Sequence, residues 1–192
     1  MPSYRAPQRD IQFVMHEVLA MSDHYKTLQG NEDIDVQTID AILEEASKFA
    51  ENVLAPINAS GDEQGCTWDD GHVTTPAGFK EAYARYVEGG WPSISHSPSV
   101  GGQGLPESLG TMINELSGTS NWSWSMYPGL SHGAMNTIET HGTDAQKTLY
   151  LLPLVEGRWT GTMCLTESHC GTDLGLLRTK AEPQADGSYA IT

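Results

Sequence analysis

Apolar residues recur at three- and four-residue steps through most of the chain, which is the spacing of one face of an α-helix. The clearest stripe follows Asp35 and predicts a long amphipathic helix over 35–57. Pro56 lies near its end, where proline ends or kinks a helix because it has no N–H to donate. The stripe consists of Ile39, Ile42, Leu43, Ala46, Phe49, Ala50, Val53, Leu54 and Ile57.

Weaker periodicity predicts further helices on both sides of this one. A short amphipathic helix is expected over 10–26, and its apolar face consists of Ile11, Val14, Val18 and Met21. The polar, glycine-rich sequence over 60–76 is expected to form a surface connection.

Helical spacing resumes after this connection. Thr75 is expected to be the N-cap and Pro76 the first residue of a helix that ends at Gly89. Three more helices are expected: from about Pro106, over 130–140 and over 144–152.

The pattern changes after residue 157, where β-branched and apolar residues replace the helical spacing. Strands are expected over 158–167 and over 187–192. Helices first and strands last indicate an α+β fold, in which an all-helical bundle precedes the opening of a β domain. We divide the chain into an N-terminal extension, a helical domain and the start of the β domain, at 1–34, 35–157 and 158–192.

Charge and cysteine content narrow the functional classes. The formal net charge of -15 at pH 7 argues against a nucleic acid or an anionic membrane surface as the main partner. Cys66, Cys164 and Cys170 form an odd set without small-scaffold spacing, which fits reduced thiols in the cytosol. The N-terminal sequence lacks the apolar run of a signal peptide, and no apolar stretch of about 18 residues occurs. A cytoplasmic protein without membrane insertion is therefore expected.

A glycine-rich segment raises the question of nucleotide binding. Gly102 and Gly104 are followed by Glu107 where the dinucleotide-binding pattern needs a third glycine, and no expected strand precedes them. We therefore interpret the segment as a connection between helices.

Residues 163–175, MCLTESHCGTDLG, contain the highest density of side chains that could react or bind a ligand. A zinc site built on Cys164, His169 and Cys170 is disfavoured, because structural zinc sites usually pair closely spaced cysteines and have a second pair. The sequence has no second pair, so no metal is expected.

A nucleophilic hydrolase is disfavoured as well, because a nucleophile and its base normally meet through the fold rather than along the chain. Sequence neighbours that could suggest such a pair are His169–Cys170, Ser131–His132 and Ser95–His96.

The third interpretation is a strand that runs into a ligand-binding turn. Met163 to Thr166 would end the strand, and Gly171 would let the backbone approach a ligand closely. Thr166 and Thr172 would place hydroxyl groups on either side. An ordinary hairpin with buried thiols stays open as the alternative.

Residues 164–173, CLTESHCGTD, resemble a signature of the acyl-CoA dehydrogenase family. In that signature a small residue, an aliphatic residue, Thr or Ser, and Glu precede two variable positions, a small residue, Gly, Ser or Thr, and Asp. Cys170 and Leu176 depart from the pattern, and Ser168 replaces a frequent proline. Three other segments are similar to family segments: HGTDAQKTLYLLPLVEGRWTGTMCLTE, PSVGGQGLP and the opening YRAPQRDIQFVMHEVL, which resembles the N-terminal extension of one bacterial subgroup.

The resemblance implies an FAD enzyme with an N-terminal helical domain, a middle β-barrel-like domain and a C-terminal helical domain. In this family a glutamate from the last domain removes the α-proton of an acyl-CoA thioester while the flavin accepts hydride from the β-carbon. Glu167 is then structural, and the base is expected beyond Thr192. The residues implied to contact FAD are Met163, Cys164, Leu165, Thr166, Gly171 and Thr172, and Thr172 is also implied to contact the pantetheine arm of CoA.

The implied function is α,β-dehydrogenation of an acyl-CoA to the 2-enoyl-CoA. Electron-transfer flavoprotein is the expected partner, and the full-length protein is expected to be a homo-oligomer. This chain would carry the first part of the flavin and CoA site and be inactive alone. The alternative is a noncatalytic homologue or fragment that acts as a folding or assembly unit.

Overall fold

The computed structural model describes residues 3–192, which form two compact units. The helical unit ends at Thr162, and the C-terminal unit consists of residues 163–192. No helix described within residues 3–192 combines the length and the apolarity needed to cross a membrane.

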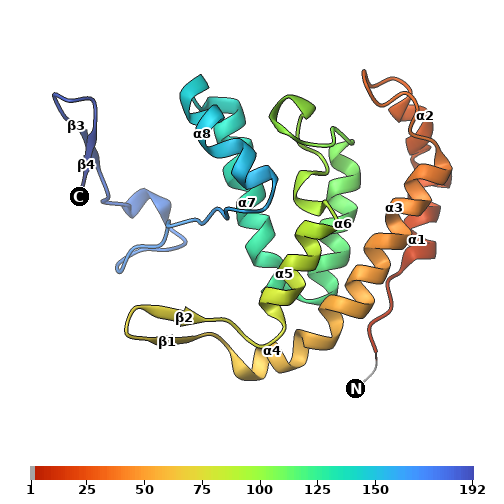
Figure 1. Ribbon diagram of the computed structural model, residues 1–192, viewed down its shortest axis with the longest axis horizontal. Coiled ribbons are helices and arrows are strands. Elements are labelled where there is room, and N and C mark those ends of the chain that lie inside the picture. The colour runs from red at the N-terminus through yellow and green to blue at the C-terminus, as the bar shows by residue number, and fades with distance from the viewer. Residues whose placement is uncertain (1–2) are drawn as a thin grey trace. The chain divides into compact units, whose positions relative to one another are not determined.

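Within the helical unit, helices packed side by side form the bundle expected from the sequence. Figure 1 shows α3, α6, α7 and α8 as neighbouring helices, and the closest pairs are α3 with α6, α6 with α7, and α7 with α8. The α-helices are α1 (Gln8–Phe13), α2 (Met21–Tyr25), α3 (Val36–Phe49), α4 (Asn58–Gln64), α5 (Phe79–Glu88), α6 (Glu107–Ser120), α7 (Trp122–His141) and α8 (Asp144–Val155).

The long stripe forms α3 and the turns that follow it. Asp35 caps α3, because its side chain accepts a hydrogen bond from the backbone N–H of Thr38 at 2.8 Å. Near Pro56 the hydrogen-bond spacing changes to a π-helical turn and then a 3₁₀ turn, over Ala50–Leu54 and Ala55–Ile57, before α4 begins. The proline therefore interrupts the α-helical ladder without ending the helical path.

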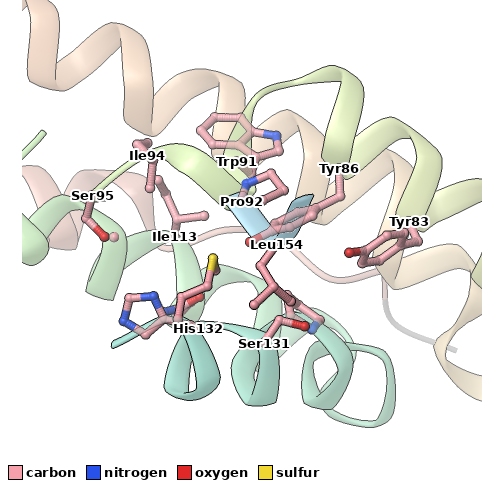
Figure 2. A pocket seen from close by; sticks show the side chains of 14 residues that line it. Tyr83, Tyr86, Trp91, Pro92, Ile94, Ser95, Ile113, Ser131, His132 and Leu154 are labelled. Carbon is pink, nitrogen blue, oxygen red and sulfur yellow. The ribbon is translucent and has the colours of Figure 1, made fainter. Parts of the chain in front are cut away.

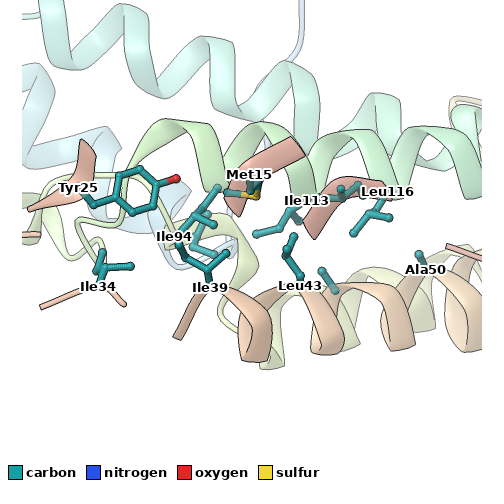
Figure 3. Close-up of a cluster of buried hydrophobic side chains, with 12 residues drawn as sticks. Met15, Tyr25, Ile34, Ile39, Leu43, Ala50, Ile94, Ile113 and Leu116 are labelled. Atoms are coloured by element: carbon teal, nitrogen blue, oxygen red, sulfur yellow. The ribbon is translucent and has the colours of Figure 1, made fainter. Parts of the chain in front are cut away.

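The stripe faces inward, as predicted. Figure 3 shows Ile39, Leu43 and Ala50 opposite Ile113 and Leu116 of α6. All of these side chains are buried, with Ile39 and Ala50 fully so. A second cluster surrounds the fully buried Trp124, and it contains Phe49, Leu54, Phe79, Ala82 and Tyr86.

The single helix expected over 10–26 is wrong in detail. A π-helical turn, Val14–Val18, follows α1, and Ala20 in the left-handed region, at φ 48°, separates it from α2. A π-helical turn contains more residues than an α-helical turn, so the residues that face the bundle are not those that α-helical spacing predicts. Met15 is consequently buried, whereas Val14 and Val18 are exposed.

The expected surface connection contains an antiparallel hairpin, which the sequence reading missed. Strands β1 (Thr67–Asp69) and β2 (His72–Thr74) pair with Trp68 opposite Val73. The turn consists of Asp70 and Gly71, both at positive φ, and Asp-Gly is a preferred pair for such two-residue turns.

Two expected helix starts are also corrected. Helix α5 begins at Phe79 after Gly78 in the left-handed region, so Thr75 and Pro76 do not start it. Helix α7 begins at Trp122 rather than at 130, because the Asn121 side chain accepts a hydrogen bond from Trp124 N–H at 3.0 Å. Pro128 thus lies inside a helix.

The C-terminal unit contains one hairpin, β3 (Ala181–Pro183) with β4 (Tyr189–Ile191), which confirms the expected strand at the chain end. The expected strand over 158–167 is wrong. None of the strands described within residues 3–192 pairs with that segment. The N–H of Gly161 donates to a side chain, Ser131 Oγ, at 3.0 Å rather than to a neighbouring strand. β-propensity yields a strand only where a neighbour supplies backbone partners.

Candidate functional site

A tight turn forms at the centre of the signature-like segment. The N–H of Glu167 donates to the Cys170 carbonyl at 2.9 Å, and the N–H of Cys170 donates to the Glu167 carbonyl at 3.2 Å. Ser168 and His169 form the turn between them. This reciprocal pair reverses the chain and brings Thr166 beside Gly171, where an added Cβ would lie 3.6 Å from Thr166 Cγ2.

The carboxylate of Glu167 closes a larger loop. Its oxygens accept hydrogen bonds from the backbone N–H of Arg178, at 3.0 Å to Oε2, and from that of Thr179, at 2.9 Å to Oε1. Hydrogen bonds from Thr179 and Arg178 hold the pKa of Glu167 at about 2. We call this arrangement the Glu167 clip.

Two further side chains brace the same loop. His169 Nε2 lies 2.9 Å from the Leu176 carbonyl and 3.4 Å from Glu167 Oε2. The Asp173 side chain accepts a hydrogen bond from Gly175 N–H at 3.0 Å and caps the 3₁₀ turn Leu174–Leu176. Residues 167–179 are therefore ordered by side-chain bonds to the main chain.

The residues expected to contact a cofactor lie on both sides of the turn. Residues 163–166 precede it as an exposed segment outside any regular helix or strand, and residues 171–172 follow it. Met163 is 64% exposed and Leu165 is 37% exposed. Thr172 is exposed as well, whereas Cys170 is buried.

Three possible metal ligands converge at the turn. Among residues 3–192, Glu167, His169 and Cys170 each offer a ligand atom, and these atoms lie within 4.8 Å of one another. Cys164 does not belong to this group. The Glu167 oxygens and His169 Nε2 make hydrogen bonds to the main chain of the same loop.

The sequence neighbours considered as nucleophile and base make other contacts. Ser131 Oγ donates to the Tyr127 carbonyl at 3.1 Å and accepts from the N–H of Gly161. His132 Nε2 lies 3.0 Å from Glu107 Oε1 rather than beside Ser131 Oγ. This geometry gives no activated serine at that position.

A small cavity lies inside the helical unit. Figure 2 shows Ser131 and His132 on one side of it and Trp91, Pro92 and Tyr86 on the other. Its volume is about 20 Å³. Because this is room for about one water molecule, the cavity is too small for an acyl chain.

The glycine-rich connection, residues 93–105, is a compact loop between helices, as the sequence indicates. The N–H groups of Gln103, Gly104 and Leu105 donate to the carbonyls of residues 93, 96 and 94. A Cβ on Gly102 would lie 1.9 Å from the His96 carbonyl oxygen, so only glycine fits there. The glycines thus serve chain packing.

Sequence reasoning missed the partners of the Glu167 clip. Arg178 and Thr179 lie eleven and twelve residues from Glu167, and no periodicity connects them. The Asp173 cap could have been found, because an Asp followed two residues later by a glycine N–H is a common local motif.

Comparisons with known proteins agree with the fold of the helical unit. The acyl-CoA dehydrogenase N-terminal domain family matches residues 37–158. The 3-methylmercaptopropionyl-CoA dehydrogenase of Ruegeria pomeroyi is 40% identical over 190 residues, which cover 99% of this chain and 32% of that protein. This similarity therefore extends beyond the residues that the family model matches.

Solved structures share the fold. Butyryl-CoA dehydrogenase from Megasphaera elsdenii matches with a TM-score of 0.67 and 26% identity, over 83% of this chain and 40% of that one. An acyl-CoA dehydrogenase complexed with FAD from Bacillus anthracis matches with a TM-score of 0.65 and 19% identity, over 88% of this chain and 27% of that one. The chain spans about a third of the length of the curated relatives it matches. On the family match and the 40% identity, the chain belongs to the acyl-CoA dehydrogenase family.

Proposed function

We propose that the chain carries the N-terminal part of the flavin and CoA site of an FAD-dependent acyl-CoA dehydrogenase. The reaction proposed for the whole protein is α,β-dehydrogenation of an acyl-CoA thioester to the 2-enoyl-CoA. The observation that carries the proposal is the exposed segment 163–166, which leads directly into the turn closed by the Glu167 clip. When bound, FAD supplies the hydride acceptor.

The chemistry of this segment fits a flavin. Met163 and Leu165 offer exposed apolar surface to a planar ring, and Thr166 offers a hydroxyl to its polar edge. Within residues 3–192 no strand occupies the backbone of 163–166, so its N–H and C=O groups are accessible. Cys164 belongs to the same segment.

The residues after the turn are proposed to contact the chain of the cofactor and the substrate. Gly171 lies beside Thr166, and both Gly171 and Thr172 are exposed, which suits a diphosphate or an amide. Thr172 is also proposed to contact the pantetheine arm of the acyl-CoA.

Glu167 is proposed to support the loop and not to act as the base. A general base works best with a pKa near the operating pH, whereas the pKa of Glu167 is about 2. Its oxygens also face backbone N–H groups of the same loop. We expect the base in a part of the protein beyond Thr192.

The remaining assignments follow from the family. The proposed redox partner is an electron-transfer flavoprotein, and the proposed full-length assembly is a homo-oligomer. A nucleic acid is not proposed as a partner, because the net charge of -15 would repel it. We propose a cytoplasmic location.

Flavin retention tests the proposal. A product that continues past Thr192 is expected to purify with visible flavin absorbance or to bind added FAD. In that product Thr166→Val should weaken FAD binding by about 1 to 3 kcal/mol, because it leaves a buried partner of the hydroxyl unpaired. Thr166→Ser keeps the hydroxyl and should retain FAD.

The alternative is a noncatalytic folding or assembly unit. It is favoured if the longer product folds but binds no FAD, or if Thr166→Val and Thr166→Ser retain FAD equally. Either result would contradict the proposed flavin site.

A further inference from the structure

Two histidines meet inside the helical unit, outside the turn described above. His96 belongs to the glycine-rich connection and is 3% exposed, and His132 belongs to α7. Their ring centroids are 5.1 Å apart. At this separation two protonated rings repel each other in a poorly solvated place.

Carboxylates from two helices face the pair. Glu139 of α7 places Oε2 3.7 Å from His96 Nδ1, and Glu107 of α6 places Oε1 3.0 Å from His132 Nε2. The Asn136 amide nitrogen also lies 3.0 Å from His132 Nε2. A neutral Nε2 accepts from Asn136, whereas a protonated Nε2 donates to Glu107, so His132 has a partner in either state.

His96 has no such alternative hydrogen-bond partner. Its Nε2 atom is buried and has no hydrogen-bond partner among residues 3–192. Protonating the ring would bury an N–H without an acceptor. Burial, and then the neighbouring His132, lower the pKa of His96, while Glu139 and Glu107 oppose them.

The backbone around His96 couples the ring to the loop. The His96 carbonyl accepts a hydrogen bond from Gly104 N–H at 2.9 Å, and the Ile94 carbonyl accepts from Leu105 N–H at 2.9 Å. Gly102 packs against the same His96 carbonyl, so the residue has little room to shift. The main chain therefore connects His96, whose ring is buried, to the closing hydrogen bonds of residues 104 and 105.

We propose that His96 stays neutral beside His132 at neutral pH and keeps the glycine-rich connection closed, and that the connection opens when acid drives a proton onto His96. This proposal is independent of flavin binding, because every residue in it belongs to the helical unit.

The closed and opened forms bind protons with different affinities, and this difference sets the direction of the pH dependence. In the closed form the pKa of His96 is below its ordinary value of 6.5, so the opened form takes up the proton first as the pH falls. Closure is thus fully stable above pH 6.5 and weakens below it.

Amide hydrogen exchange in the 192-residue chain tests this coupling between about pH 7.5 and about pH 5, a range that spans the ordinary histidine titration. Protection of the Gly104 and Leu105 amides, corrected for intrinsic exchange, should fall as the pH drops below 6.5, by at most about tenfold per pH unit, since opening binds one extra proton. Protection of the Leu43 amide in α3 should fall less. Constant protection at Gly104 and Leu105 would overturn the proposal.

Two variants should shift the acid response in opposite directions. His132→Gln removes a ring that opposes protonation of His96 and should shorten the pH range over which protection falls, whereas Glu139→Gln removes a carboxylate that favours protonation and should extend it. His141→Gln, at the exposed end of α7, is the matched control and should behave like the unaltered chain. If both test variants change protection equally at every pH, the histidines are only structural and the proposal is wrong.

Discussion

The helical unit and the C-terminal unit are ordered by different forces. In the helical unit, helices bury continuous apolar faces, and Ile39, Leu54 and Trp124 are fully buried. Among residues 163–192 only Cys170 is buried, and the Glu167 clip orders the loop instead. Hydrophobic burial scales with area, whereas each hydrogen bond adds little net free energy. The proposed flavin-contacting residues thus lie where geometry can change without unfolding the bundle.

The largest expected effect is in the apolar core. Phe49 is 8% exposed and packs against Trp124 with a ring-centroid distance of 5.8 Å. Phe49→Ala should lower the free energy of unfolding by about 3 to 5 kcal/mol, measured by denaturant titration. Val36→Ala, on the exposed face of the same helix, is the control. A cost below about 1 kcal/mol for Phe49→Ala would mean that the stripe is not core.

A smaller effect is expected in the glycine-rich connection. Gly102→Ala should destabilise the chain by about 1 to 3 kcal/mol, because its Cβ would meet the His96 carbonyl. An added Cβ at Gly133 in α7 would contact no other atom within 4 Å. Gly133→Ala should therefore stabilise the chain by about 0.5 to 1 kcal/mol, since alanine favours the helix. Equal effects in thermal or denaturant unfolding would contradict the packing described for Gly102.

The smallest effect on global stability is expected at the Glu167 clip. Glu167→Gln should speed exchange of the Arg178 and Thr179 amides while leaving that of Leu43 unchanged, because the clip acts locally. Glu182→Gln, an exposed change in β3, is the matched control. Faster exchange throughout α3 would show that the two units are not separately ordered.

The clip also has a pH signature. The pKa of Glu167 falls from its ordinary value of 4.5 to about 2 in the folded loop. The contribution of the carboxylate is therefore complete above pH 4.5 and is lost as the pH falls toward about 2. The amide chemical shifts of Arg178 and Thr179 should therefore titrate with a midpoint of about 2. A midpoint near 4.5 would contradict the clip.

Local patterns predicted much of the helical unit. The stripe that includes Ile39 and Leu43 gave α3 and its buried face, because helix periodicity and burial coincide there. Proline was a weaker guide: the helical path continues past Pro56, and α7 contains Pro128. Pro56 lies at the start of a 3₁₀ turn, where its missing N–H costs little, whereas Pro128 is buried inside α7.

The C-terminal unit was harder to predict. Threonine and apolar residues favoured a strand over 158–167, but strand formation depends on a neighbour that the local sequence does not specify. The signature-like residues located the turn, and the bonds from Glu167 to Arg178 and Thr179 became visible only in the fold. Asp70–Gly71 did carry a hairpin signal, which the surrounding polar residues obscured.

Anaerobic flavin reduction by a panel of acyl-CoA thioesters tests the central claim most directly. Dehydrogenation needs a base and a flavin on opposite faces of the Cα–Cβ bond, held at reacting distance. The chain of 192 residues is proposed to supply only the first part of the flavin side. We expect a product that continues past Thr192 to show flavin bleaching with at least one thioester, and the 192-residue chain mixed with FAD to show none. Bleaching at an enzymatic rate by the 192-residue chain alone would contradict this account.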